Sequence, residues 1–130
     1  MKILFTFPGQ GTQHPGMLRA LPGTELAQAR EVLGAEIDTL DTAEALQHTR
    51  AVQLCLLIAG VAWARELKRR DVSPDIVSGL SIGAYPAAVI AGALDYADAL
   101  WLVALRGDLM EQAWPHGYGL TAIMGLTLPQ

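Results

Sequence analysis

The sequence predicts an α/β fold, in which a partial parallel sheet is flanked by helices. Short apolar segments that stop at turn residues alternate with longer segments of helical periodicity, in the order strand, helices, strand, helix, helix, strand. Parallel strands need helices as crossover connections, and the spacing of the apolar segments leaves room for them. Three strands make a thin sheet, and no partner follows the last one. We therefore expect the chain to be the front part of a larger domain.

The first half of the chain contains one predicted strand and three predicted helices. Residues 2–7 are apolar and stop at Pro8-Gly9, which is typical of a short buried strand. Thr24 stands where the N-cap of the first helix is expected, and a second short helix is expected around residues 43–46. The longest apolar segment predicts a helix from about residue 50 to residue 70.

The second half predicts two more strands and two more helices. Residues 75–80 read as another buried strand, and a helix that opens at Ser81-Ile82-Gly83-Ala84 follows it to a stop at Gly92. A further helix is expected from Asp95 to about Ala113. Residues 120–128 predict a third strand.

Composition and charge exclude several classes of function. The 130 residues are 52% hydrophobic, which excludes a disordered chain, and a formal net charge of −4 argues against a nucleic-acid surface. Apolar residues 51–64 form too short a run for a membrane span, which needs roughly 20. The single cysteine, Cys55, reads as a small buried hydrophobic residue, so a reducing, cytoplasmic location is predicted. We expect neither a membrane partner nor a metal site.

A candidate nucleophile lies in Gly79-Leu80-Ser81-Ile82-Gly83, between a predicted strand and a predicted helix. In a nucleophile elbow the glycines allow a tight turn, the serine side chain stands clear of the sheet, and the next backbone N–H helps to bind an oxyanion. The alternative is a turn of small residues whose serine only caps the helix that starts at Ile82. The strand before it and the helix after it favour the elbow.

The loop over residues 8–16 is a candidate for the second oxyanion donor. It contains three glycines and two prolines, and it follows the first strand. Because parallel strands end on the same side of a sheet, this loop and Ser81 can face one crevice. A glycine-rich connection that binds nothing is the alternative.

Arg106 lies on an otherwise apolar stripe of the last predicted helix, with Leu102, Val103 and Met110 at helical spacings from it. Arginine is rarely buried unpaired. A carboxylate elsewhere in the protein pairs with it, its side chain extends to solvent, or it binds an anionic group of a substrate. The sequence leaves these three alternatives open.

A nucleophilic serine needs a base, usually a histidine. The candidates are His14, His48 and His116, and each lies in a polar or loop segment typical of surface residues. The sequence therefore predicts no base within these residues.

Four blocks of residues lie in the same order as in a known family. They are Phe7-Pro8-Gly9-Gln10-Gly11-Thr12-Gln13 with Gly16-Met17, then Gly79-Leu80-Ser81-Ile82-Gly83, Ala91-Gly92-Ala93 and Arg106-Gly107-Asp108-Leu109-Met110. With these blocks the chain resembles the malonyl-CoA:acyl-carrier-protein transacylases over essentially its whole length. The resemblance implies transfer of a malonyl group to the thiol of a carrier protein, with malonyl-CoA as substrate and no bound cofactor.

The resemblance also implies roles for individual residues. Ser81 takes the malonyl group as an ester, Gln10 and Ile82 supply oxyanion-hole N–H groups, and Arg106 pairs with the free carboxylate of malonate. Such pairing explains selection for malonyl, because an acetyl group would leave the arginine unpaired. Two further candidate substrate-binding residues are Gln53 and Met110.

Three residues depart from the usual family pattern, namely Leu80, Ala84 and Pro86. This variant resembles the transacylase subunit of bacterial malonate decarboxylase. The carrier of that system bears a phosphoribosyl-dephospho-CoA arm rather than the phosphopantetheine arm of fatty-acid synthesis. A fatty-acid-synthesis transacylase stays an alternative, as do an α/β-type serine hydrolase and a catalytically incomplete binding or assembly fragment.

Members of this family are longer than 130 residues. The resemblance therefore implies an amino-terminal fragment, whose catalytic histidine lies beyond residue 130. Residues 1–117 would form the first part of the large, α/β-hydrolase-like subdomain of the acyltransferase fold. Residues 118–130 would begin a small ferredoxin-like subdomain.

Overall fold

The structure, a computed structural model, describes residues 1–113, 116–117, 119, 121 and 123–127. The first half holds strand β1 (Leu4–Phe7), helix α1 (Glu25–Leu33) and helix α2 (Thr49–Arg69), and the second half holds β2 (Ile76–Gly79), α3 (Ala84–Ile90) and α4 (Tyr96–Ala113). Within the described residues, three short 3-10 helices complete the order: Gly34–Thr39, Ala45–Gln47 and Ser81–Gly83. The predicted α/β fold, with a partial parallel sheet and flanking helices, is confirmed.

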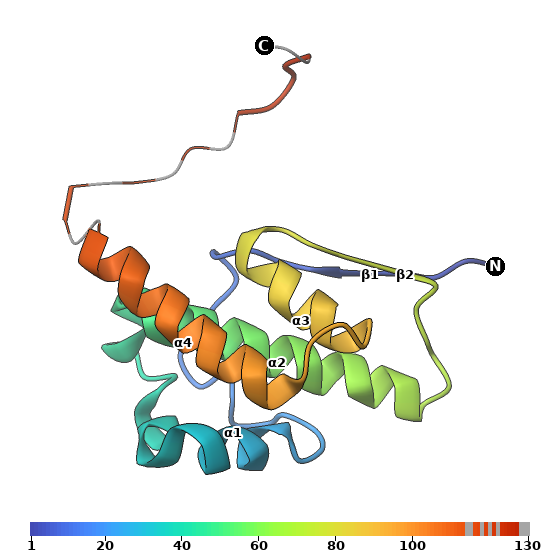
Figure 1. Ribbon diagram of the computed structural model, residues 1–130, viewed down its shortest axis with the longest axis horizontal. Helices are drawn as coiled ribbons and strands as arrows, with labels where there is room; N and C mark the ends of the chain where they lie inside the picture. Colours follow the sequence, from blue (N-terminus) through green and yellow to red (C-terminus); the bar gives the residue numbers. More distant parts are fainter. Residues whose placement is uncertain (114–115, 118, 120, 122, 128–130) are drawn as a thin grey trace.

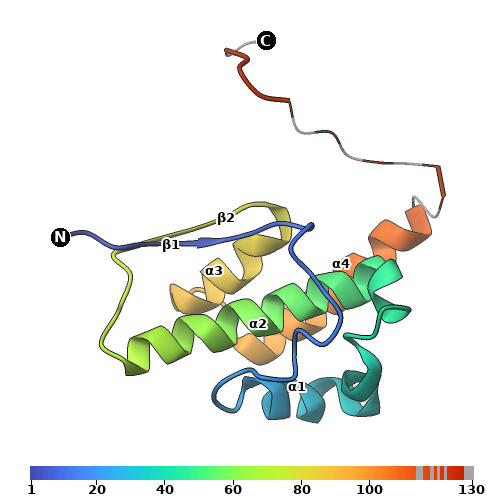
Figure 2. The ribbon, with the colours of Figure 1, turned by 180° about the vertical axis from the view of Figure 1, so that it is seen from behind.

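The sheet consists of β1 and β2, which pair in parallel from Leu4 opposite Ile76 to Phe7 opposite Gly79. Figures 1 and 2 show the two strands side by side with the helices on one side of them. Both strands are shorter than predicted. The prediction that they are buried is wrong at their first residues, since Leu4 is 56% and Ile76 60% exposed. In the described chain each strand has one neighbour and helices on one side, which leaves these side chains uncovered.

The predicted third strand, residues 120–128, is not found in the part of this range that the structure describes. Residues 121 and 123–127 form no strand, and residues 120, 122 and 128 lie outside the described part of the chain. Ile123, Met124 and Leu126 are exposed. A strand needs a neighbour to satisfy its backbone groups, and none is available to this segment within the described residues.

The helices follow the predicted pattern, with differences in detail. Thr24 holds the N-cap position of α1, but its side chain makes no capping hydrogen bond. Gln28 Nε2 donates to Thr24 Oγ1 instead, at 3.3 Å. The short helix expected around residues 43–46 is a 3-10 turn at Ala45–Gln47.

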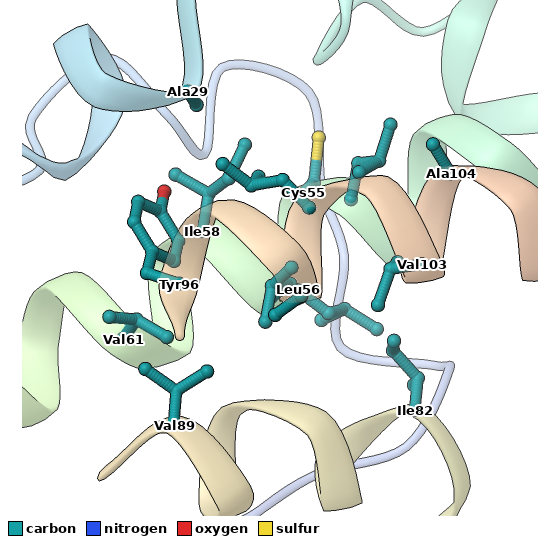
Figure 3. Packing of buried hydrophobic residues seen from close by; sticks show 14 of the residues in the cluster. Ala29, Cys55, Leu56, Ile58, Val61, Ile82, Val89, Tyr96, Val103 and Ala104 are labelled. Carbon is teal, nitrogen blue, oxygen red and sulfur yellow. The ribbon is translucent and has the colours of Figure 1, made fainter. Parts of the chain in front are cut away.

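The hydrophobic core surrounds α2, which packs against α4 and α3 (Figure 3). Cys55 is fully buried there, as predicted. The two long helices approach closely at Gly107, where an added Cβ would lie 2.5 Å from the Cα of Arg50. This crossing fixes the part of α4 that carries Arg106.

None of the helices in the described ranges is both long and apolar enough to cross a membrane.

Candidate functional site

Ser81 lies at the sharp turn that joins β2 to α3. Its φ angle is +55°, in the left-handed region that non-glycine residues rarely adopt. Holding a serine there costs on the order of 1–3 kcal/mol, which the surrounding structure must offset. The residue is exposed. This backbone conformation is the one expected of a nucleophile elbow.

The two glycines of the motif make this turn possible. A Cβ on Gly79 would lie 2.0 Å from the carbonyl oxygen of Gly83, and a Cβ on Gly83 would lie 2.1 Å from that of Phe7. Neither position has room for a side chain. The turn therefore folds back on itself and rests against the end of β1.

Ser81 does not act as a helix cap. The N-cap positions of the 3-10 turn and of α3 are Leu80 and Gly83, and neither side makes a side-chain capping bond. The Oγ atom of Ser81 instead accepts a hydrogen bond from Arg106 Nη2 at 3.0 Å.

The loop after β1 lies against the elbow. The N–H of Leu80 donates to the carbonyl oxygen of Phe7 at 3.2 Å, and a Cβ on Gly9 would lie 3.1 Å from the carbonyl oxygen of Leu80. Gln10 follows directly and is exposed, while the Ile82 side chain is fully buried. The segment that precedes Gln10 thus packs against the elbow that contains Ser81 and Ile82.

Arg106 is a half-buried cation that no acidic side chain neutralises within the described residues. Its Nη1 atom is buried and has no hydrogen-bond partner in that part of the chain. Its guanidinium carbon lies 5.7 Å from the centre of the Tyr85 ring. Of the three alternatives left by the sequence, an arginine that awaits an anionic ligand fits these contacts best.

Gln53 and Met110 also come together, at the contact between α2 and α4. Gln53 Nε2 donates to Met110 Sδ at 3.2 Å, and Gln53 Oε1 is buried without a partner among the described residues. Met110 follows Arg106 by one helical turn, on the same face of α4. A buried amide with unused hydrogen-bonding capacity beside this face is suited to contact a polar ligand.

No histidine of the described chain is hydrogen-bonded to Ser81. His48 Nδ1 lies 2.6 Å from Glu111 Oε1, and His14 Nδ1 lies 3.3 Å from the carbonyl oxygen of Pro15. His116 is exposed. These positions agree with the surface locations that the sequence predicted.

Sequence reasoning missed Tyr85. It follows Ser81 by one turn, but the sequence holds no signal that connects it with an arginine on the next helix.

Comparison with known proteins gives a consistent result. The acyl transferase domain family matches residues 4–126. The malonyl CoA-acyl carrier protein transacylase of Haemophilus influenzae is 43% identical over 96% of this chain and 44% of its own length. The acyl carrier protein S-malonyltransferase of Vibrio cholerae superposes with a TM-score of 0.80 and 39% identity, over 90% of this chain and 42% of that one.

Another solved structure, of a type II polyketide acyl-carrier protein in complex with its malonyl-transacylase, superposes with a TM-score of 0.79 and 38% identity. The match covers 90% of this chain and 41% of that one. The present chain thus spans less than half the length of these relatives. With the family match and the elbow geometry together, the chain belongs to the acyl transferase domain family.

Proposed function

We propose that the protein transfers a malonyl group from malonyl-CoA to the thiol of an acyl carrier protein, through an ester on Ser81. The observation that carries this proposal is the 3.0 Å contact between Arg106 Nη2 and Ser81 Oγ. It places a cation with an unused donor, Nη1, beside an exposed serine. Relatives named as malonyl transacylases support the same activity.

The proposed first step is attack of Ser81 Oγ on the thioester carbonyl carbon. The Oγ–C bond forms, the C–S bond breaks, and CoA leaves as its thiol with the proton that Ser81 loses. The thiol of the carrier then attacks the ester and Ser81 recovers a proton. A base must carry this proton. The family resemblance assigns this role to a histidine.

Charge that develops on the carbonyl oxygen is stabilised, in this proposal, by the backbone N–H groups of Gln10 and Ile82. In support, Phe7 and Gly9, just before Gln10, contact Leu80 and Gly83, which flank Ser81 and Ile82. Two donors to one oxyanion require such proximity. Gln53 and Met110 would line the substrate pocket beside Arg106, because they contact each other where α2 packs against α4.

Arg106 would select malonyl over acetyl donors. In a malonyl ester a single methylene separates the ester carbonyl from the free carboxylate, so that carboxylate lies within reach of a guanidinium beside Oγ. A planar guanidinium can bind a carboxylate through two parallel hydrogen bonds. An acetyl group would leave these buried donors unpaired, which is costly.

The carrier is the finer part of the proposal. Leu80, Ala84 and Pro86 favour the carrier of malonate decarboxylase, with its phosphoribosyl-dephospho-CoA arm. The relatives favour an acyl carrier protein, because their names specify one. We propose malonyl transfer to a carrier thiol and expect the acyl carrier protein to be preferred. We also propose that the protein is cytoplasmic and that a subdomain boundary follows residue 117.

The experiment measures malonyl and acetyl transfer to each carrier by the full polypeptide that carries this sequence. Arg106→Ala should lower malonyl transfer by about 10- to 100-fold, the range expected for lost hydrogen bonds to a charged group, and leave acetyl transfer nearly unchanged. Arg70→Ala is the matched control, because Arg70 contacts only Glu66 through its side chain in the described chain. Unchanged discrimination in Arg106→Ala would remove Arg106 from this role. Free malonate as the main product would indicate a hydrolase instead.

A further inference from the structure

Arg106 has an unusual environment for an arginine with a buried nitrogen. A guanidinium that loses water is normally paired with a carboxylate. Arg106 lacks such a partner in the described ranges, and its Nη1 atom is both buried and unpartnered. The contacts that remain are the Ser81 hydroxyl at 3.0 Å and the aromatic ring of Tyr85 at 5.7 Å.

Tyr85 is well placed to hold this cation. It occupies the first turn of α3, and it is half-buried and packed against the hydrophobic core. Because α3 begins directly after the elbow, the ring is anchored to the same segment that fixes Ser81. The ring therefore links the position of the guanidinium on α4 to that of the serine.

An aromatic ring stabilises a guanidinium in a different way from a carboxylate. A carboxylate would accept hydrogen bonds and occupy two N–H donors of Arg106. The face of a ring attracts the positive charge through its electron distribution and occupies no donor. The ring thus holds the arginine in place without using any of its donors, and Nη1 stays available to a ligand.

We propose that Tyr85 is a positioning residue, which holds Arg106 beside Ser81 and leaves Nη1 free for the carboxylate of an incoming acyl group. The inference rests on the proposed function, because it assigns Tyr85 to the same site. It extends that function by a residue that acts through Arg106.

The test compares Tyr85→Leu, which removes the ring, with Tyr85→Phe, which keeps it. In Tyr85→Leu the KM for malonyl-CoA should rise by about 2- to 30-fold, the range of a cation–π contact, with kcat and acetyl transfer nearly unchanged. Tyr85→Phe should stay within about twofold of the parent. In an Arg106→Ala background, Tyr85→Leu should have no further effect on malonyl transfer, because the two residues act as one unit.

A general packing role would give a different pattern. Tyr85→Leu would then lower malonyl and acetyl transfer equally, and its effect would add to that of Arg106→Ala. Either result would overturn the proposal. Where Tyr85→Leu does not fold, phenylalanine with successive ring fluorines at position 85 keeps the shape and weakens the negative face of the ring. The KM for malonyl-CoA should then rise with each fluorine, and a constant KM would also overturn the proposal.

A second readout does not depend on activity. The NMR signal of the Arg106 Nε–H group should report a restrained side chain in the parent and in Tyr85→Phe. In Tyr85→Leu it should report a side chain that averages over several positions. If the parent protein transfers no malonyl group, the proposed function is wrong. The NMR signal still shows in that case whether Tyr85 positions Arg106. An unchanged signal in Tyr85→Leu would overturn the positioning role alone.

Discussion

At the scale of single residues, the site depends on two positions that have no side chain. Gly79 and Gly83 allow the backbone to approach itself and the end of β1 within distances that no Cβ could tolerate. Ser81 is then held at a φ of +55°, with its Oγ within hydrogen-bond distance of Arg106. The position of the proposed nucleophile is therefore set by its neighbours.

Gly83→Ala tests this dependence. The new methyl group would lie 2.1 Å from the Phe7 carbonyl oxygen, so the elbow must move away from β1. We expect a loss of about 1–3 kcal/mol in the free energy of unfolding, as for other overpacked sites, together with loss of acyl transfer. Denaturant unfolding and the transfer assay measure the two effects.

The matched control is Gly119→Ala, because a Cβ at Gly119 would meet nothing within 4 Å and its φ angle is not in the left-handed region. It should change the unfolding free energy by less than about 0.5 kcal/mol. Equal stability of the two variants would contradict the account of the elbow.

The sequence predicted part of this site for a physical reason. A serine between two glycines, with a strand before it and a helix after it, has one dominant geometry, so the elbow follows from local pattern. The apolar neighbours of Arg106 likewise indicated a cation in need of a partner. The contacts of Arg106 with Ser81 and Tyr85 join residues on different elements, and local periodicity carries no information about such contacts.

At the scale of elements, the crossing of α2 and α4 sets where Arg106 lies. Arg50 forms ion pairs with Glu36 at 2.7 Å and with Asp108 at 2.6 Å, so it ties α2 to the segment before it and to α4. These contacts hold the pKa of Arg50 above its usual value. Gly107, beside Arg106, allows the helices to touch at this point.

Gly107→Ala should therefore move Arg106 as well as destabilise the protein. A Cβ at this position would lie 2.5 Å from the Arg50 Cα, so α4 must shift outward. We expect an unfolding free energy lower by about 1–3 kcal/mol and a weaker preference for malonyl over acetyl donors. Gln112→Ala, at an exposed position of the same helix, is the control and should retain both properties. A stable Gly107→Ala with unchanged preference would contradict this account.

The elements themselves were predicted with uneven success. The long helices α2 and α4 follow from sustained apolar periodicity and end within a residue or two of the expected positions. The strands were expected to be buried because their residues are apolar. Exposure depends on which other elements cover a strand, and residues such as Leu4 and Ile76 carry no signal of that.

At the scale of the whole molecule, apolar side chains remain uncovered on two sides. Trp101, Leu102, Leu105 and Leu109 are exposed along α4. On the other side, an apolar groove of about 400 Å³ runs between β1 and α2, past Trp63. Both surfaces agree with the expectation that the chain is the front part of a larger domain, which stays a prediction.

Cys55 reports on the stability of the whole fold, because it is fully buried in the core around α2. Burial, with a smaller effect of Asp41, raises the pKa of its thiol to about 12. At pH 8 a thiol reagent should therefore label Cys55 only when the protein unfolds, at a rate that rises with added denaturant. Rapid labelling of the folded protein would contradict this packing.

The raised pKa also predicts a dependence of stability on pH. The unfolded thiol loses its proton near pH 9, whereas the folded one keeps it to about pH 12. The contribution of Cys55 to the unfolding free energy is therefore complete below pH 9 and decreases between these values. The unfolding free energy of the parent and of Cys55→Ala, measured as a function of pH, tests this prediction. The alanine variant has no thiol and should lack this decrease.

The central claim is that Ser81 carries the acyl group, and mass spectrometry of the protein after reaction with malonyl-CoA tests it most directly. A malonyl adduct should be found on the peptide that contains Ser81, should disappear in Ser81→Ala, and should persist when the exposed strand residue is changed in Ser78→Ala. Folded protein whose Ser81 stays unmodified, or an adduct that survives in Ser81→Ala, would contradict the account.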